Sequence, residues 1–190
     1  MKKNRNSKHV AASLALTALF VALMAVCAFL SVPFSPVSFT MQTFAVFLAV
    51  YVLGTKRAVA AVTVYIAIGA AGLPVFAGFR GGIGVLAGPT GGYIVGFLFT
   101  ALLGGVLTER AGGRRIPAFL SLLSGLVLCY AFGTAWFALV YASSGGTVSV
   151  SFILGAAVLP FIIPDLIKII LAIELGRRLK PVADRIVGGE

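Results

Sequence analysis

Long apolar runs, separated by short connections that carry basic residues, restrict the folds open to this sequence. A membrane-spanning helix needs about 20 mostly apolar residues, and six segments approach this requirement. They cover residues 10–30, 40–53, 58–73, 92–107, 116–141 and 152–175. Only 11% of the chain is charged, against about 25% in an average soluble domain. The sequence therefore predicts an all-α integral membrane protein, a six-transmembrane-helix bundle that forms a single membrane domain over residues 1–190.

The positions of the basic residues predict the orientation of these helices. All but two of the 15 Lys and Arg residues flank the apolar segments, at alternate connections. These residues are Lys2, Lys3, Arg5, Lys8, Lys56, Arg57, Arg110, Arg114, Arg115, Arg177, Arg178, Lys180 and Arg185. Cytoplasmic loops are rich in Lys and Arg, so we expect both termini on the cytoplasmic side of the cell membrane. This placement also accounts for the net charge of +10, and we expect no nucleic acid partner.

Three of the segments depart from a plain 20-residue helix. The first, residues 10–30, is longer than the apolar core of a cleavable signal peptide, so we interpret it as a retained helix. The second, residues 40–53, is short, and we expect it to borrow residues from the preceding loop. The sixth contains Pro160 and Pro164, which disturb a regular helix in its first half.

A glycine-rich stretch, GFRGGIGVLAGPTGG, links the third and fourth segments. Seven of the 15 residues from Gly78 to Gly92 are glycine, and Pro89 adds a further break. Such a stretch does not form a regular helix at low cost. Non-helical backbone at membrane depth is tolerated where protein or a water-filled cavity covers it. Two interpretations remain open here: a flexible external loop, or an ordered loop that folds over a pocket near the outer face.

Three ionisable residues lie away from the flanks, and they are the strongest functional signal. Arg80 falls in the glycine-rich stretch, and Asp165 and Lys168 fall in the sixth segment. Residues three apart share a helix face, and at 1.5 Å per residue Lys168 lies about 13 Å above Arg177. Ionisable groups at membrane depth usually face a cavity and mark a function. One interpretation is an ion pair that merely neutralises itself. The other is a binding site whose net charge of about +1 attracts an anionic ligand.

Two weaker patterns also indicate possible roles. Tyr93 follows the last glycine pair at the start of the fourth segment, a position suited to lining a pocket. In the first segment Ala18 and Ala22 form an A-x-x-x-A, as do Ala11 and Ala15. Small residues at this spacing let helices approach closely, either inside the bundle or against a partner protein.

Common catalytic and nucleotide-binding motifs are missing from the sequence. GVLAGPTG resembles a phosphate-binding loop but lacks its lysine. The sequence also has no G-x-S-x-G, no H-E-x-x-H and no cluster of Cys, His and carboxylates. We therefore expect neither an enzyme nor a self-energised pump, and no metal or other cofactor.

Three stretches of the sequence resemble the BioY family, the biotin-specific substrate-binding subunits (S components) of energy-coupling-factor (ECF) transporters. These stretches are GLPVFAGFRGGIGVLAGPTGGYIVGF from Gly72 to Phe97, PDLIK from Pro164 to Lys168, and SVPFSPVSFTMQTFAVFLA from Ser31 to Ala49. The resemblance implies a six-helix bundle that binds biotin near the outer face with high affinity. It also implies a transmembrane coupling subunit and two ABC-type ATPases as partners.

The resemblance implies roles for the residues singled out above. Arg80, Asp165 and Lys168 would bind biotin. From the chemistry of these side chains we infer that the two cations suit the biotin carboxylate and that Asp165 suits the ureido N–H groups. Ala18 and Ala22 would contact the coupling subunit. The alternatives are an S component for another small anionic vitamin, or a small channel or structural membrane subunit.

Overall fold

Helices form almost all of the regular structure, because a helix satisfies its own backbone hydrogen bonds in an apolar setting. The computed structural model describes residues 2–33, 37–143, 145 and 149–188, with side chains described from residue 9 to residue 187 within those ranges. The elements are α1 (Lys2–Phe29), β1 (Ser31–Val32), β2 (Phe39–Thr40), α2 (Gln42–Leu53), α3 (Thr55–Ala70), α4 (Ile83–Ala87), α5 (Gly91–Phe99), η1 (Thr100–Gly104), α6 (Gly105–Arg110), α7 (Arg115–Ser143), α8 (Val150–Ala157) and α9 (Leu159–Gly188). The predicted flank Lys2, Lys3, Arg5 and Lys8 lies on helical backbone, and its side chains fall outside this description.

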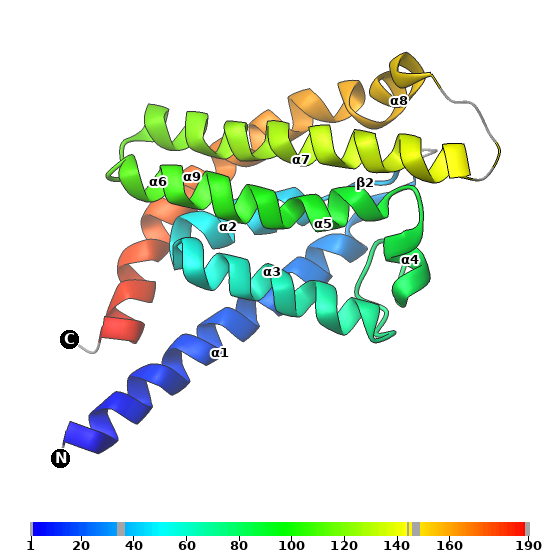
Figure 1. Ribbon diagram of the computed structural model, residues 1–190. Helices are drawn as coiled ribbons and strands as arrows, with labels where there is room; N and C mark the ends of the chain where they lie inside the picture. The colour runs from blue at the N-terminus through cyan, green and yellow to red at the C-terminus, as the bar shows by residue number, and fades with distance from the viewer. Residues whose placement is uncertain (1, 34–36, 144, 146–148, 189–190) are drawn as a thin grey trace.

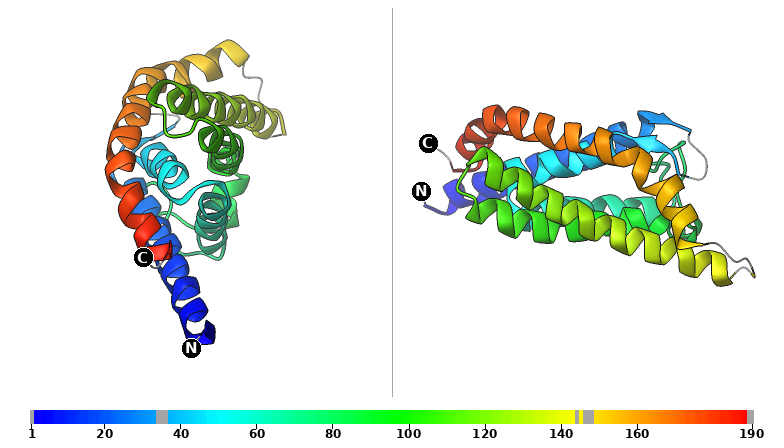
Figure 2. Two further views of the ribbon diagram at one scale, coloured as in Figure 1. Left: turned by 90° about the vertical axis from the view of Figure 1, so that its left-hand side faces the viewer. Right: turned by 90° about the horizontal axis from the view of Figure 1, so that it is seen from above.

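The helices pack into an elongated bundle with two distinct ends (Figures 1 and 2). Toward one end of the bundle point the first turns of α1, the last turns of α9, the α2–α3 turn and the α6–α7 turn. The β1–β2 ribbon, α4 and the start of α8 lie at the other end. The described basic residues that flank the segments lie in the first turn of α3, around the connection between α6 and α7, and toward the end of α9. These basic residues therefore gather at the end that holds both chain termini, while Arg80 belongs to the opposite end.

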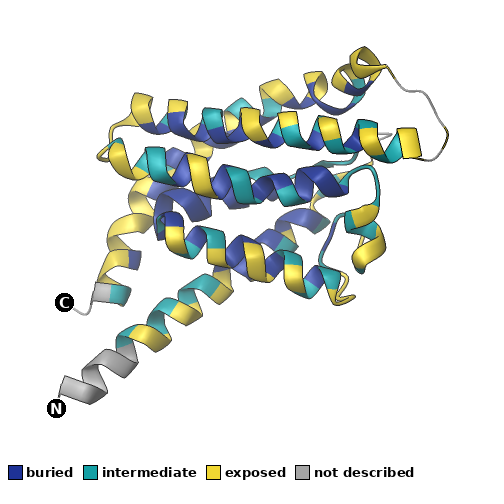
Figure 3. Ribbon diagram, in the orientation of Figure 1, coloured by how far each residue is buried: buried dark blue, intermediate teal, exposed yellow. Residues whose placement is uncertain are grey.

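Helix α2 forms the centre of the bundle. Every residue from Ala45 to Leu53 is buried, and the helix packs against α9, α1 and α3. Figure 3 shows this element dark blue between partly exposed neighbours. A helix that is apolar on all sides is buried on all sides, which explains why α2 takes the central place. The expectation that this segment continues into the preceding loop is wrong for the helix itself, because the preceding residues form the β1–β2 ribbon.

The last segment is bent in its first half, as predicted, next to one of its two prolines. Helices α8 and α9 meet at Val158 with a bend of 41°. Pro160 has no N–H, and its ring crowds the carbonyl four residues earlier, so the helix breaks just before it. Pro164 is accommodated within α9. The fourth segment runs through α5, η1 and α6, with one π-helical turn at Thr100–Gly104.

Length and hydropathy identify membrane-spanning candidates among the described residues. Three stretches qualify alone, namely His9–Phe29, Gly91–Arg110 and Arg115–Ser143, and the bent pair α8–α9 makes a fourth when taken as one span. Helices α2 and α3, with 12 and 16 residues, overlap the other two predicted segments, and both are shorter than the roughly 20 residues of a full span. The chain is therefore a helical, multi-pass membrane protein.

Candidate functional site

A cavity of about 100 Å³ lies among α2, α5, α7 and α9, beside β2 and the glycine-rich stretch. Its wall includes all four residues predicted to bind a ligand, Arg80, Tyr93, Asp165 and Lys168. They come from parts of the chain up to 88 residues apart, counted from Arg80 to Lys168. The fold therefore brings the predicted residues to a single site.

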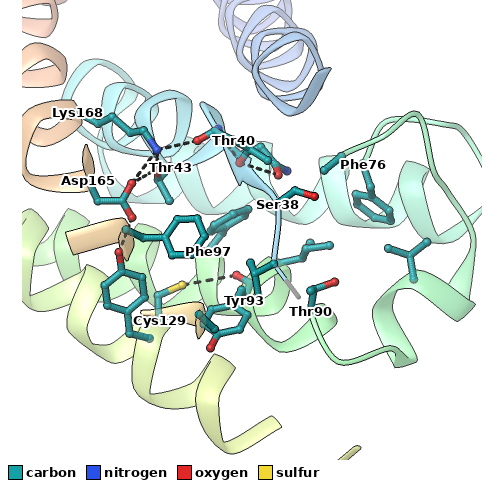
Figure 4. A pocket seen from close by; sticks show the side chains of 18 of the residues that line it. Ser38, Thr40, Thr43, Phe76, Thr90, Tyr93, Phe97, Cys129, Asp165 and Lys168 are labelled. Atoms are coloured by element: carbon teal, nitrogen blue, oxygen red, sulfur yellow. Dashed lines mark hydrogen bonds and ion pairs between the residues drawn. The ribbon is translucent and has the colours of Figure 1, made fainter. Parts of the chain in front are cut away.

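Asp165 and Lys168 form a buried ion pair on one face of α9 (Figure 4). Lys168 Nζ lies 2.8 Å from Asp165 Oδ1, and the two side chains are only 5% and 3% exposed. The spacing of three residues places them on the same helix face, as predicted. Both charges therefore remain inside the bundle and stabilise one another directly.

Other groups make further hydrogen bonds to this pair. Lys168 Nζ also donates to the Thr40 carbonyl oxygen at 2.6 Å and to Thr43 Oγ1 at 3.1 Å, and it lies 4.2 Å from the centre of the Phe39 ring. The Thr43 hydroxyl donates to Asp165 Oδ1 at 2.8 Å, and the Tyr130 hydroxyl donates to Oδ2 at 2.5 Å. An ammonium group has three N–H donors. Lys168 uses all three on protein acceptors, so its charge is fully committed to the pair.

Arg80 presents a different kind of cation to the cavity. Its residue is exposed, and its Nε donates to the Ala77 carbonyl oxygen at 3.1 Å. Within the described part of the chain, its terminal nitrogens donate to no protein acceptor. With the Asp165–Lys168 pair neutral as a unit, Arg80 gives the site its net charge of +1 and leaves a planar donor fork available for a carboxylate.

The glycine-rich stretch is ordered against the cavity. Phe76 and Arg80 exchange backbone hydrogen bonds of 2.9 and 3.3 Å, which close a tight hairpin. The Trp136 indole N–H donates to the Gly88 carbonyl oxygen at 3.1 Å, and Thr90 reaches the cavity wall. Of the two interpretations of this stretch, the structure supports the ordered loop.

Tyr93 stands on α5 and faces α7. Its ring packs where a side chain at Gly133 would sit, so the absence of a Cβ there lets the two helices approach. Its hydroxyl and that of Thr134 share a hydrogen bond of 3.3 Å. Together with Phe76, Phe97 and Phe161, Tyr93 gives the cavity wall its large aromatic side chains.

Several residues of the site were not identified from the sequence. Thr43 and Gln42 gave a signal, since they are polar residues at the start of an otherwise apolar helix. Tyr130 gave none beyond being one aromatic among many. The Thr40 contact uses a backbone carbonyl, which side-chain identity does not reveal.

The small residues of α1 lie on the outside of the bundle. Ala18 and Ala22 are exposed, as are Ala11 and Ala15, and the amino-terminal half of α1 extends away from the other helices (Figures 1 and 2). These four alanines therefore do not serve packing between helices within this chain. Among the described residues, no group of three His, Cys, Asp or Glu side chains is placed to hold a metal ion.

Comparison with known proteins gives the family. The profile of the BioY family matches residues 1–185. The chain belongs to the BioY family. It is 42% identical to the Biotin transporter BioY of Thermotoga maritima, over 85% of this chain and 92% of the relative. It is also 42% identical to the Probable biotin transporter BioY of Pyrococcus horikoshii, over 90% of this chain and 97% of the relative.

A solved structure shares the BioY fold described here. The crystal structure of the S-component for biotin from an ECF-type ABC transporter superposes with a TM-score of 0.79 at 28% identity, and the match covers 95% of both chains. The BioY relatives are transporter subunits and not enzymes, in line with the missing catalytic motifs.

Proposed function

We propose that this chain is the high-affinity biotin-binding membrane subunit, or S component, of an ECF-type vitamin uptake transporter. Its relatives in Thermotoga maritima and Pyrococcus horikoshii are named as biotin transporters. The similar solved structure is the S-component for biotin of an ECF-type ABC transporter.

The observation that carries this proposal is a single cavity with a free cation, an apolar wall and a buried carboxylate. Biotin offers matching groups: a carboxylate, an apolar chain and ring, and a ureido group with two N–H donors. We propose that Arg80 binds the ligand carboxylate, because Lys168 already uses its three donors on protein atoms. Asp165 Oδ2, which accepts one hydrogen bond from Tyr130, accepts a second from a ureido N–H group. Lys168 is the counter-ion of Asp165, and Tyr93 packs against the apolar portion.

The proposal also covers the orientation of the subunit in the membrane and its partner proteins. The six predicted segments each cross the cell membrane, and both termini are cytoplasmic, which suits the gathering of described basic residues at one end. The cavity then lies toward the outer face. A transmembrane coupling subunit and two ABC-type ATPases supply the energy for uptake. Ala18 and Ala22 form the contact with the coupling subunit, since exposed small residues permit close helix approach.

A thermal-shift series on the detergent-purified protein tests the ligand. We expect biotin to raise the melting temperature, because a ligand at 100 times its dissociation constant adds about 2.7 kcal/mol to stability. Desthiobiotin keeps the carboxylate and the ureido group and should give a smaller shift in the same direction. Riboflavin and thiamine serve as controls. A shift with either control but none with biotin would assign the site to another vitamin, and no shift with any of the four compounds would favour a structural subunit.

A further inference from the structure

A buried tyrosine of α3 holds the hairpin that carries Arg80 by a hydrogen bond and a ring contact. Tyr65 is 1% exposed, and its hydroxyl donates to the Val75 carbonyl oxygen at 2.9 Å. Its ring meets that of Phe76 edge-on, with 5.5 Å between the ring centres. Val75 and Phe76 form the first arm of the hairpin that the Phe76–Arg80 backbone pair closes. Tyr65 therefore holds the base of the segment on which Arg80 stands.

The same hydroxyl is connected to the ion pair on the other side of the cavity. It accepts from Gln42 Nε2 at 2.6 Å, and Gln42 Oε1 accepts from the Thr40 hydroxyl at 3.2 Å. The Thr40 carbonyl oxygen in turn accepts from Lys168 Nζ at 2.6 Å. A continuous chain of polar contacts thus runs from Lys168 through Thr40, Gln42 and Tyr65 to the hairpin. Gln42 is 5% exposed, so most of this chain is shielded from solvent.

We propose that Tyr65 is a positioning residue for ligand recognition. Its hydroxyl fixes the hairpin relative to the Asp165–Lys168 pair, and so sets the separation between the cation that binds the ligand carboxylate and the groups that bind its other end. Tyr65 is absent from the cavity wall given by the described residues, so it acts through Arg80 and not by touching the ligand. This inference rests on the proposed function. It predicts selectivity for the acid over its uncharged ester.

Tyr65→Phe tests the proposal, because it keeps the ring and removes only the hydroxyl. The hairpin then loses an anchor, and Arg80 loses its fixed position. We expect the dissociation constant for biotin to rise about fivefold, as for the loss of one hydrogen bond, while that for biotin methyl ester stays nearly constant. Equilibrium competition in detergent measures both. Arg80→Gln gives the reference loss of acid preference. Tyr51→Phe is the matched control, since Tyr51 is also a buried tyrosine but packs at Gly176, away from the cavity.

A ligand-free measurement tests the anchoring separately. Amide hydrogen exchange across residues 73–82 should be faster in Tyr65→Phe than in wild type, while exchange in α7 stays the same, because the backbone bonds of Phe76, Arg80 and Gly82 lose their support. If Tyr65→Phe does not fold, Gly69→Ala takes its place. A methyl group at Gly69 would overlap the Phe76 ring, so it displaces the hairpin without removing a polar group. The same selective loss for the acid is expected.

The outcomes separate this inference from the function on which it rests. Wild-type protein that binds no biotin would overturn both. Wild-type protein that prefers biotin to its ester, with Arg80→Gln removing the preference and Tyr65→Phe leaving it intact, would overturn the positioning role alone. Equal losses for acid and ester in Tyr65→Phe would assign Tyr65 to packing and also overturn that role. A lowered acid preference with faster exchange of the hairpin would support it.

Discussion

At the scale of single residues, Asp165 and Lys168 are each the counter-ion of the other inside the bundle. Either alone would be a buried charge without a counter-ion, and removing one partner of a buried pair typically costs about 3–5 kcal/mol. We expect Asp165→Asn and Lys168→Met each to lower the free energy of unfolding by that amount. The double variant should lose less than the sum, by about 0.5–3 kcal/mol. Unfolding of the ligand-free protein in detergent measures all three.

The exposed pair Arg115–Glu174 provides the control for this prediction. Its nitrogen and oxygen lie 2.7 Å apart, but its side chains are 63% and 46% exposed. Exposed pairs contribute about 0–1 kcal/mol, so Arg115→Gln should leave stability nearly unchanged. Additive losses in the Asp165 and Lys168 variants would mean that the two charges are not coupled, in contradiction to the geometry.

At the scale of elements, α1 carries the exposed small residues that we propose contact the coupling subunit. Ala18→Leu with Ala22→Leu should abolish assembly with the coupling subunit and ATP-driven uptake, because larger side chains hold the helices apart. Biotin binding by the isolated subunit should persist, since neither residue lines the cavity. Pull-down of the coupling subunit and uptake of labelled biotin measure the two effects.

Helix α7 supplies a matched pair for that experiment. Ala131 and Ala135 have the same spacing and are also exposed, so Ala131→Leu with Ala135→Leu adds equal bulk to another outer face. The complex should tolerate this change. Loss of assembly in both double variants would indicate a general packing defect, and normal assembly of the α1 variant would move the coupling surface elsewhere.

Helix periodicity made much of this arrangement predictable from the sequence. The spacing of Asp165 and Lys168 predicted their shared face. Pro160 and Pro164 predicted a disturbance in the first half of the last segment, where the break at Val158 lies. Arg80 was singled out because it lies away from the basic flanks, in a segment expected at membrane depth, where an ionisable group usually has a function. The chain from Lys168 to Tyr65 was not predictable, because it depends on a backbone carbonyl and on which face of α3 meets the hairpin. Tertiary packing decides both, and local sequence records neither.

At the scale of the whole molecule, the gathering of described basic residues at one end leads to a prediction about sidedness. Ser143 and Arg114 are exposed at opposite ends of α7. In intact cells Ser143→Cys should react with a membrane-impermeant maleimide, and Arg114→Cys should react only after permeabilisation. The native Cys27 and Cys129 are buried and should stay unlabelled in the unaltered protein. The reverse labelling pattern would invert the proposed topology.

The shortness of α2 has a consequence for how a membrane bundle makes room for a solute. Its 12 residues extend about 18 Å at 1.5 Å per residue, whereas the hydrocarbon layer is about 30 Å thick. The cavity lies beyond the amino-terminal turn of this helix, where Thr40, Gln42 and Thr43 form part of its wall. The cavity therefore lies at the amino-terminal end of the central helix, which is too short to fill that space. In such a bundle the ligand site adjoins the amino-terminal end of the central helix, while longer helices such as α7, with 29 residues, form another part of its wall.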